Sequence, residues 1–169
     1  MKHEESNLQI GCVRWFRGEY PELAMLLTHP INEGSGNTSI DRMRQGIHKA
    51  EGTKAGVSDL LFFMPAEYRK PVPTNGIEWI ITYYGLGIEF KTPKGKQSQE
   101  QKDFQEMFEA AGYKYEIVRS LEDFQNVMKD YVGHITDFRL RAVDEAYDII
   151  VEAAAEREKD RFYKIIGKK

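Results

Sequence analysis

Charged residues interrupt two short apolar segments of this chain, and that combination restricts the folds open to it. Residues 57–64 read VSDLLFFM, which is too short and too continuously apolar for a surface helix and is typical of a buried strand. Residues 88–91 read IEFK and follow the β-rich stretch IEWIITYY. Because an unpaired charge is costly inside a buried strand, Asp59, Glu89 and Lys91 are candidates for a functional role.

Helices are predicted before, between and after these strands. Apolar residues repeat at helical spacing over 4–17, and Ser39, Ser98 and Ser120 can each cap the start of a helix. A further strand is predicted over 113–118, where apolar and polar residues alternate. The run LAMLL fits a buried strand or a helical turn, because periodicity does not distinguish the two. The order of elements predicts an α/β sandwich, with helices flanking a mixed central sheet.

The C-terminal part is predicted to be one long helix outside the main domain. Residues 135–164 keep a helical pattern, with inward positions at Phe138, Ala142, Ala146, Ile149, Ile150 and Ala153. Gly133 marks a boundary, so we expect one domain over 1–133 and an accessory helix over 134–169 packed on it. The helix after Ser39 is likewise expected to have one apolar face, formed by Ile40, Met43, Ile47 and Ala50.

Three segments rich in glycine or proline are predicted to lack regular structure. INEGSGNTS at 31–39 is expected to be a loop, and PAEYRKPVPTNG at 65–76 holds three prolines and is expected to be irregular. Gly85-Leu86-Gly87 lacks the third glycine of a dinucleotide-binding motif and is expected to be a turn.

The composition excludes several classes of protein. The 169 residues, 41% of them hydrophobic, suit one packed domain. A single cysteine, Cys12, excludes an internal disulfide and a Cys-based zinc site. No apolar run approaches the ~18 residues of a membrane span, and no signal-peptide pattern is present, so a cytoplasmic protein without membrane contact is expected. Because the net charge is −3, any nucleic-acid contact must come from a local basic patch.

The charged strand residues form a set suited to a divalent cation. Glu89 and Lys91 share one face of their strand, while Phe90 points to the opposite face. If the two strands are neighbours, Asp59 lies beside Glu89, and two close carboxylates repel each other unless a cation lies between them. Mg²⁺ takes one or two carboxylates with water, and Lys91 could orient a water or stabilise charge on a phosphate. The alternative is a pair of solvated strand-end acids, with Lys91 pairing Glu89.

Two polar features follow the second strand. The turn Thr92-Pro93-Lys94-Gly95-Lys96 places Lys94 and Lys96 where they could contact phosphates, although a solvated turn is the better explanation of this segment taken alone. Ser98 and Gln101 fit an S-x-x-Q capping box at a helix start. Gln101 could instead point toward the charged cluster, and one side chain is not expected to serve both purposes.

Several motifs then occur in a fixed order along the chain. They are Gly56-Val57-Ser58-Asp59, then Ile88-Glu89-Phe90-Lys91, then Gly95 with Ser98 and Gln101, and finally Gly112-Tyr113 with Val118-Arg119-Ser120. This order resembles the VRR-NUC family of phage-type replication and repair nucleases, whose pattern is G-V-P-D, I-E-x-K, G-x-x-S-x-x-Q and G-Y-x-V-x-R-S. The family belongs to the PD-(D/E)xK superfamily, and the resemblance covers roughly residues 5–132.

The resemblance implies a PD-(D/E)xK nuclease fold and assigns roles within it. Asp59 and Glu89, with the carbonyl of Phe90, would bind Mg²⁺ or Mn²⁺. Lys91 would be the catalytic lysine, and Gln101 a polar residue of the active site.

The resemblance extends to the N-terminal residues, and the sequence departs from the family pattern in two places. Glu5 and Gln9 match an E-x-x-x-Q motif whose acid joins the site, and Glu4 is a rival for that role. Ser58 replaces the usual proline, which is a mild change. The stretch between Asp59 and Glu89 is longer than in the family, which suggests an inserted loop or hairpin.

These expectations lead to a functional hypothesis of metal-dependent DNA cleavage. The family implies an endonuclease specific for junctions or other branched DNA, acting as a homodimer in phage replication and repair. The residues expected to contact DNA are Lys94, Lys96, Ser98, Arg42, Arg44 and Lys49. One alternative is a DNA-binding or assembly module that keeps the fold without cutting, and a weaker one is a restriction-type enzyme.

Overall fold

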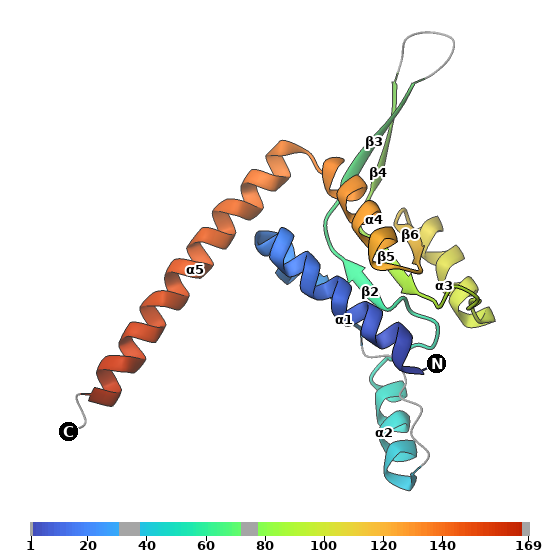
Figure 1. The fold of residues 1–169 in the computed structure, drawn as a ribbon, viewed down its shortest axis with the longest axis horizontal. Coiled ribbons are helices and arrows are strands. Elements are labelled where there is room, and N and C mark those ends of the chain that lie inside the picture. Colours follow the sequence, from blue (N-terminus) through green and yellow to red (C-terminus); the bar gives the residue numbers. More distant parts are fainter. Residues whose placement is uncertain (1, 31–37, 72–77, 167–169) are drawn as a thin grey trace. The chain divides into compact units, whose positions relative to one another are not determined.

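The fold is given by a computed structural model, which describes residues 2–30, 38–71 and 78–166 (Figure 1). The chain divides into two compact units, 1–135 and 136–169. Each unit is described by itself.

A four-stranded sheet forms the centre of the first unit. Its strands are β1 (Leu27–Thr28), β2 (Leu60–Phe62), β5 (Leu86–Phe90) and β6 (Lys114–Val118). They lie in the order β1-β2-β5-β6, with β5 antiparallel to β2 and parallel to β6, and with β1 antiparallel to β2. The predicted mixed sheet is therefore confirmed.

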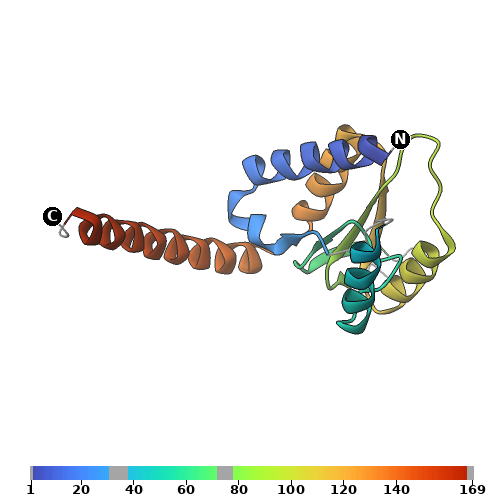
Figure 2. The ribbon, with the colours of Figure 1, turned by 90° about the horizontal axis from the view of Figure 1, so that it is seen from below.

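Helices cover both faces of this sheet (Figure 2). On one face lie α1 (Lys2–Glu19) and α4 (Leu121–Gly133), and on the other lies α3 (Gln99–Ala110). Phe16 of α1 meets Phe62 at a centroid distance of 5.5 Å, and Phe124 of α4 stacks on Phe90 at 6.1 Å. Across the sheet, Phe108 of α3 packs near Tyr115 of β6. The predicted α/β sandwich, with helices on both faces, is confirmed.

The core follows the alternation of side chains along β5. All five residues of this strand are buried, and Leu86, Ile88 and Phe90 share the face toward α1 and α4. Gly87 and Glu89 share the opposite face, where a Cβ on Gly87 would lie 2.9 Å from the Phe108 ring. Gly87 therefore belongs to a strand where close packing requires glycine, and the expected turn at 85–87 is wrong at Leu86 and Gly87, which both lie in β5.

The run LAMLL and the loop before the second helix have different outcomes. LAMLL resolves into the end of a 3₁₀ helix, η1 (Pro21–Leu26), followed by the first residue of β1. Most of the expected loop at 31–39 lies outside the described residues, and α2 (Ser39–Ala50) begins at its last position.

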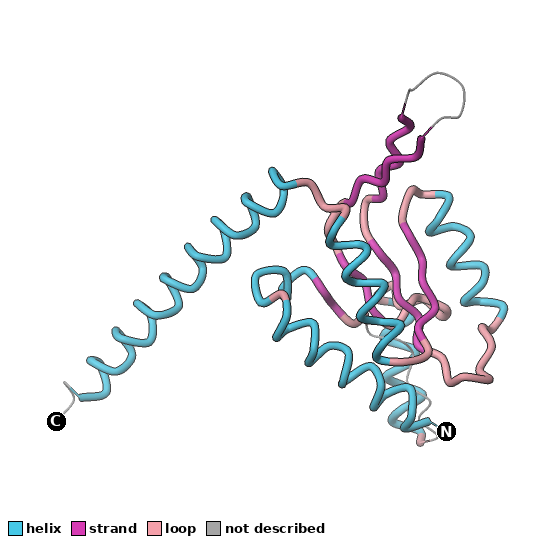
Figure 3. Tube along the Cα trace, turned by 45° about the horizontal axis from the view of Figure 1, so that its top comes forward, coloured by secondary structure: helices cyan, strands magenta, loops and turns pink. Residues whose placement is uncertain are grey.

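The segment predicted to be irregular at 65–76 instead begins a β-hairpin. β3 (Ala66–Pro71) pairs antiparallel with β4 (Glu78–Tyr83), and the hairpin projects beyond the four-stranded sheet (Figure 3). The prediction is wrong over 66–71, because Pro65 precedes the strand and Pro71 ends it, so neither interrupts the interior of the ladder. Residues 72–76, with Pro73, lie outside the described residues. Of the loop or hairpin expected between Asp59 and Glu89, the structure shows a hairpin, and its being an insertion relative to the family stays a prediction.

Tyr68 of β3 connects the hairpin to the rest of the first unit. Its ring stacks on His134 at a centroid distance of 3.8 Å, and its hydroxyl donates to Asp130 of α4 at 2.8 Å. Lys114 lies over the same ring and pairs with Asp130 at 3.5 Å. Burial and the neighbouring Asp130 carboxylate raise the pKa of Tyr68 above its ordinary value, so the hydroxyl remains a donor.

Two helices carry exposed apolar residues at positions where an inward face was expected. On α2, Met43 is 63% and Ile47 49% exposed. On α5 (Asp137–Ile166), which is described by itself, Phe138 is 81% and Ile149 67% exposed. The apolar residues of a single helix are buried only when another element packs against them. The packing of 134–169 on the first domain stays a prediction. None of the helices over the described residues has the length and apolarity needed to cross a membrane.

Candidate active site

The two strand acids lie at the same end of the sheet. β2 and β5 run antiparallel with Leu60 opposite Ile88, so Asp59 comes one step beyond that pair on the side of Glu89. The Asp59 Oδ2 atom accepts a hydrogen bond from the Phe90 backbone N–H at 2.8 Å. The structure thus brings together the carboxylates that neighbouring strands were expected to juxtapose.

Glu89 and Lys91 form a buried ion pair. Glu89 is 1% and Lys91 7% exposed, and the Lys91 Nζ atom lies 2.5 Å from Glu89 Oε1. The alternative of a solvated Glu89 is therefore wrong, although its expected pairing with Lys91 is present. A buried pair needs further hydrogen bonds to offset the loss of hydration, and other side chains supply them here.

Gln101 connects the start of α3 to this ion pair. Its Oε1 atom accepts from the Ser98 backbone N–H at 2.9 Å, while Ser98 Oγ accepts from the Gln101 backbone N–H at 3.3 Å. Its Nε2 atom donates to Glu89 Oε1. The expectation that Gln101 could not serve both purposes is wrong, because the two ends of its amide act separately.

A backbone contact fixes where Gln101 can lie. Gly56 has a φ of +86°, and a Cβ there would lie 2.3 Å from the backbone oxygen of Glu100 in the first turn of α3. Glycine is therefore required both by the left-handed conformation and by the close approach. The glycine of the Gly56-Val57-Ser58-Asp59 motif sets the start of α3 against the segment that carries Asp59.

Tyr115 completes the surroundings of Glu89 and was not identified from the sequence. Its hydroxyl donates to Glu89 Oε2 at 3.3 Å. Tyr115 lies opposite Gly87 in the parallel β5–β6 register, where the missing side chain leaves room for its ring. Burial, followed by the Glu89 charge, raises the pKa of Tyr115, so it remains a neutral donor. A glycine two residues before Glu89 was the available sequence signal.

Glu5 brings α1 to the site, whereas Glu4 is exposed. The Glu5 Oε1 atom accepts from the Thr92 backbone N–H at 2.9 Å. Both acids line a cavity of about 180 Å³ that also includes Lys91, Thr92 and Arg119. Glu5 is half-buried and Glu4 exposed, so the geometry favours Glu5 as the acid of this helix.

Arg119 holds the loop that follows Lys91. Its guanidinium donates to the Thr92 carbonyl at 2.5 Å and to the Gly95 carbonyl at 3.0 Å. The sequence indicated Arg119 only as part of a strand motif, without a role. Its place beside the loop follows from the parallel pairing of β5 with β6, which the sequence did not specify.

A second group contacts Asp59 through its backbone. His29, just after β1, has its Nδ1 atom 2.6 Å from the Asp59 carbonyl oxygen. Gln9 of α1 lies 3.1 Å from the same ring nitrogen and 3.5 Å from the same carbonyl oxygen. Because a carbonyl only accepts, His29 donates from Nδ1 in this arrangement. Gln9 belongs to the E-x-x-x-Q motif, but no sequence signal identified His29.

The acids carry more negative charge than Lys91 balances. Burial, and then the charge of Asp59, raises the pKa of Glu89 to about 7, against the lowering effect of Lys91. Burial also raises the pKa of Asp59, although the Phe90 N–H, Lys91 and His29 oppose this effect, and Glu5 adds to it. A cation at this end of the sheet would favour the ionised form of both acids.

The donor set fits a hard divalent cation that keeps part of its water. Over the described residues, no cluster of three or more His, Cys, Asp or Glu side chains is arranged to hold a metal. Mg²⁺ binds through one or two carboxylates and retains several waters, so Asp59 and Glu89 suffice as its protein carboxylates. The excess negative charge at these acids supports the same fit.

The residues expected to contact DNA lie in two places. Lys94 and Lys96 are exposed in the loop after Lys91. Ser98 is exposed, and its hydroxyl accepts the capping bond from Gln101. On α2, Lys49 is exposed, while the side chains of Arg42 and Arg44 lie outside the described part.

Comparison with known proteins gives a consistent picture of the fold. A family profile described as "VRR-NUC domain" matches residues 4–122. A solved structure described as "VRR_NUC domain protein" is similar, with a TM-score of 0.57, over 78% of this chain and 89% of that chain. The two sequences are 20% identical, so this likeness concerns the fold alone. No protein with a curated description matches the sequence.

Proposed function

Because this chain belongs to the family of VRR-NUC domains, a nuclease-type domain, we propose that it is a metal-dependent endonuclease that hydrolyses phosphodiester bonds in DNA. The observation that carries the proposal is the convergence of Asp59, Glu89 and Lys91 at one end of the sheet. The fold does not need two acids and a buried lysine at this position, because apolar residues could fill it without the free-energy cost of removing charges from water.

Asp59 and Glu89 would hold the metal, Mg²⁺ or Mn²⁺, together with the carbonyl of Phe90. When bound, such an ion lowers the pKa of a water and neutralises charge on the phosphate. The protein residues around it orient the reacting groups. Gln101 and Tyr115 fix the Glu89 carboxylate, and the Phe90 N–H fixes that of Asp59.

Lys91 is the catalytic lysine in this proposal. Its ammonium group is already positioned by Glu89, and it is 7% exposed, so little water screens its charge. It would donate a hydrogen bond to the attacking water or to a phosphate oxygen as negative charge grows there. Lys91 also lines the cavity that Glu5 and Arg119 border, next to the loop that begins at Thr92.

The substrate proposed is branched DNA, such as a four-way junction, and the resemblance to the family is its support. A symmetric dimer would present two sites to two strands, and phage replication and repair in the host cytoplasm would be its setting. Lys94 and Lys96, exposed beside Lys91, are proposed to bind phosphates near the cleaved bond.

The proposal is tested by cleavage of labelled junction, flap and duplex DNA in Mg²⁺, in Mn²⁺ and in EDTA. We expect cleavage with either metal, none in EDTA, and a preference for branched substrates. Salt-sensitive DNA binding without metal-dependent cleavage would contradict the proposal and support the non-cutting module. Cleavage that depends on one short sequence would support the restriction-type alternative.

The adjacent acids of α1 offer a matched pair of variants. Glu5→Gln is expected to lower the cleavage rate by about 10-fold or more, because it removes the charge of the acid that α1 contributes to the site and weakens the charge-assisted bond to the Thr92 backbone N–H. Glu4→Gln removes the same charge one position away and is expected to leave the rate within about twofold. Rates are measured at saturating DNA, and a larger loss with Glu4→Gln would reverse the assignment.

A further inference from the structure

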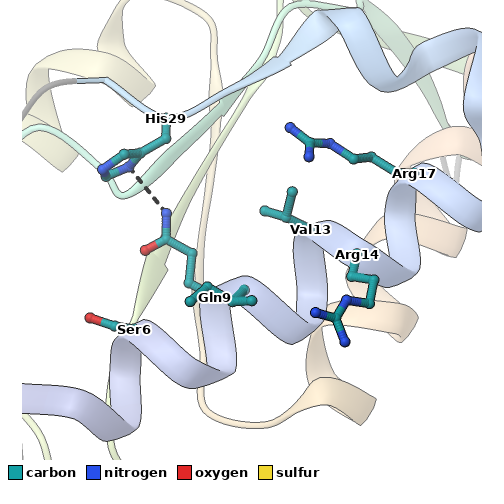
Figure 4. A pocket seen from close by; sticks show the side chains of 7 residues that line it. Ser6, Gln9, Val13, Arg14, Arg17 and His29 are labelled. Atoms are coloured by element: carbon teal, nitrogen blue, oxygen red, sulfur yellow. Dashed lines mark hydrogen bonds between the residues drawn. The ribbon is translucent and has the colours of Figure 1, made fainter.

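A second concave surface lies next to the candidate active site. This α1 pocket has a volume of about 530 Å³ (Figure 4). Its lining residues are Ser6, Gln9, Ile10, Val13, Arg14, Arg17 and His29. Six of these seven residues follow one face of α1, so the pocket runs along the helix.

The pocket is positively charged in a protein with a net charge of −3. Arg14 and Arg17 line it, and Arg17 extends from α1 toward the side where His29 lies (Figure 4). None of the described residues that line the pocket is acidic. Arginine binds phosphate through several N–H groups, and such a groove attracts a polyanion more strongly than the net charge suggests.

The pocket is continuous with the site through two shared residues. Gln9 and His29 line the pocket, and both contact the backbone carbonyl of Asp59, His29 at 2.6 Å. One end of the pocket therefore lies against the residue proposed to bind the metal. The position of Glu5 at the site shows that the N-terminal end of α1 faces the acids, and Arg14 and Arg17 follow in the C-terminal direction.

The spacing along α1 suits a nucleic-acid strand. With a rise of about 1.5 Å per residue, Arg14 lies about 7.5 Å and Arg17 about 12 Å beyond Gln9 along the helix axis. Duplex DNA rises about 3.4 Å per nucleotide along its axis, so for a duplex axis parallel to α1 Arg17 lies roughly three to four nucleotides from Gln9. Ile10 and Val13 lie between them and offer an apolar wall to the sugars.

We propose that the α1 pocket binds the sugar-phosphate backbone of the DNA strand on one side of the cleaved bond. Arg14 and Arg17 bind its phosphates, while Gln9 and His29 mark the end nearest the site. The contacts carry no base recognition, because they reach the backbone only. This inference rests on the proposed function, and it adds a strand-binding site outside the loop that holds Lys94 and Lys96.

The first test measures DNA binding without divalent metal, so that no cleavage occurs. The variant carries Arg14→Gln and Arg17→Gln, and the probe is fluorescein-labelled junction DNA over a range of salt concentrations. We expect affinity to fall at least about 10-fold at 0.15 M salt, and the slope of log K against log salt to fall by about 1.4 to 1.8, as for two lost phosphate contacts. The charge-matched control carries Arg141→Gln and Arg161→Gln, two exposed positions of α5, and should lose less than about threefold.

The second test locates the strand by shortening it. After the cleavage position is mapped with the wild type, one strand is cut to two nucleotides beyond that position, on each side in turn. Shortening on one side is expected to weaken binding by the wild type but not by the double variant, since the lost phosphates are those the two arginines bind.

The outcomes separate the two proposals. If the double variant kept the affinity and the salt slope of the wild type, the pocket would be overturned as a strand-binding site. The same holds if shortening the strand, on either side, weakened binding by the double variant as much as binding by the wild type. If the wild type still cleaved DNA, the proposed nuclease function would stand. A wild type that binds DNA through the two arginines without cleaving it would support the pocket and contradict the nuclease function.

Discussion

Replacing Lys91 with methionine is expected to lower the rate of DNA cleavage by about 10³-fold. Methionine keeps the length and the apolar stem of the side chain but removes the ammonium group, which lies 2.5 Å from Glu89 Oε1. The loss should fall on kcat more than on KM, because the ammonium stabilises charge that develops in the transition state. Single-turnover cleavage of a junction substrate in Mn²⁺ measures it.

The control for this prediction is Lys102→Met, which removes an exposed lysine of α3. It is expected to change the rate by less than about threefold. Because Lys91 is buried beside Glu89, its loss leaves a buried carboxylate unpaired, and thermal unfolding of each variant shows whether it is folded at the assay temperature. A folded Lys91→Met variant with the wild-type rate would remove Lys91 from the chemistry.

Glu89 is expected to make the metal-free protein less stable as the pH rises from 5 to 8. Burial and the charge of Asp59 raise its pKa from 4.5 to about 7, so the folded state binds this proton more tightly than the unfolded state. The stabilisation is complete below pH 4.5 and is lost as the pH passes through 7, with an upper limit of about 3 kcal/mol. Urea unfolding at pH 5, 6, 7 and 8 in EDTA measures the free energy of unfolding.

Glu89→Gln removes the titrating group and should flatten most of this pH dependence. Asp59 contributes in the same direction, because its pKa is also raised, so a smaller slope should remain. Glu106→Gln, an exposed acid of α3, should keep the wild-type profile. A wild type and a Glu89→Gln variant with parallel profiles over this range would show that the acid does not titrate as its environment requires.

Residues that act through local spacing could be predicted from the sequence. The alternation of Glu89, Phe90 and Lys91 placed two charges on one strand face, and an apolar run placed Asp59 beside a buried strand. Both inferences depend only on residues that are neighbours in the sequence. The antiparallel pairing of β2 with β5 then brings the two acids to the same end of the sheet. The caps at Ser98 and Ser120 followed the same local logic.

Features that depend on tertiary contacts could not be predicted. Tyr115 and Arg119 reach the site through the parallel pairing of β5 with β6, and His29 reaches it through the short strand β1. The two uses of the Gln101 amide depend on how close Gly56 lets the start of α3 approach. The strand over 66–71 was not predicted, because the place of Pro65 before the ladder and of Pro71 at its end is known only from the pairing of β3 with β4.

The most direct test of the account is a Mn²⁺ titration of the wild type, Asp59→Asn and Glu4→Gln, followed by the spin-resonance signal of free Mn²⁺ and performed without DNA. We expect Asp59→Asn to weaken binding at least about 10-fold, since even an outer-shell partner is worth that much, and Glu4→Gln to bind as the wild type does. Equal Mn²⁺ affinity in the wild type and Asp59→Asn would contradict the claim that Asp59 and Glu89 form one metal site.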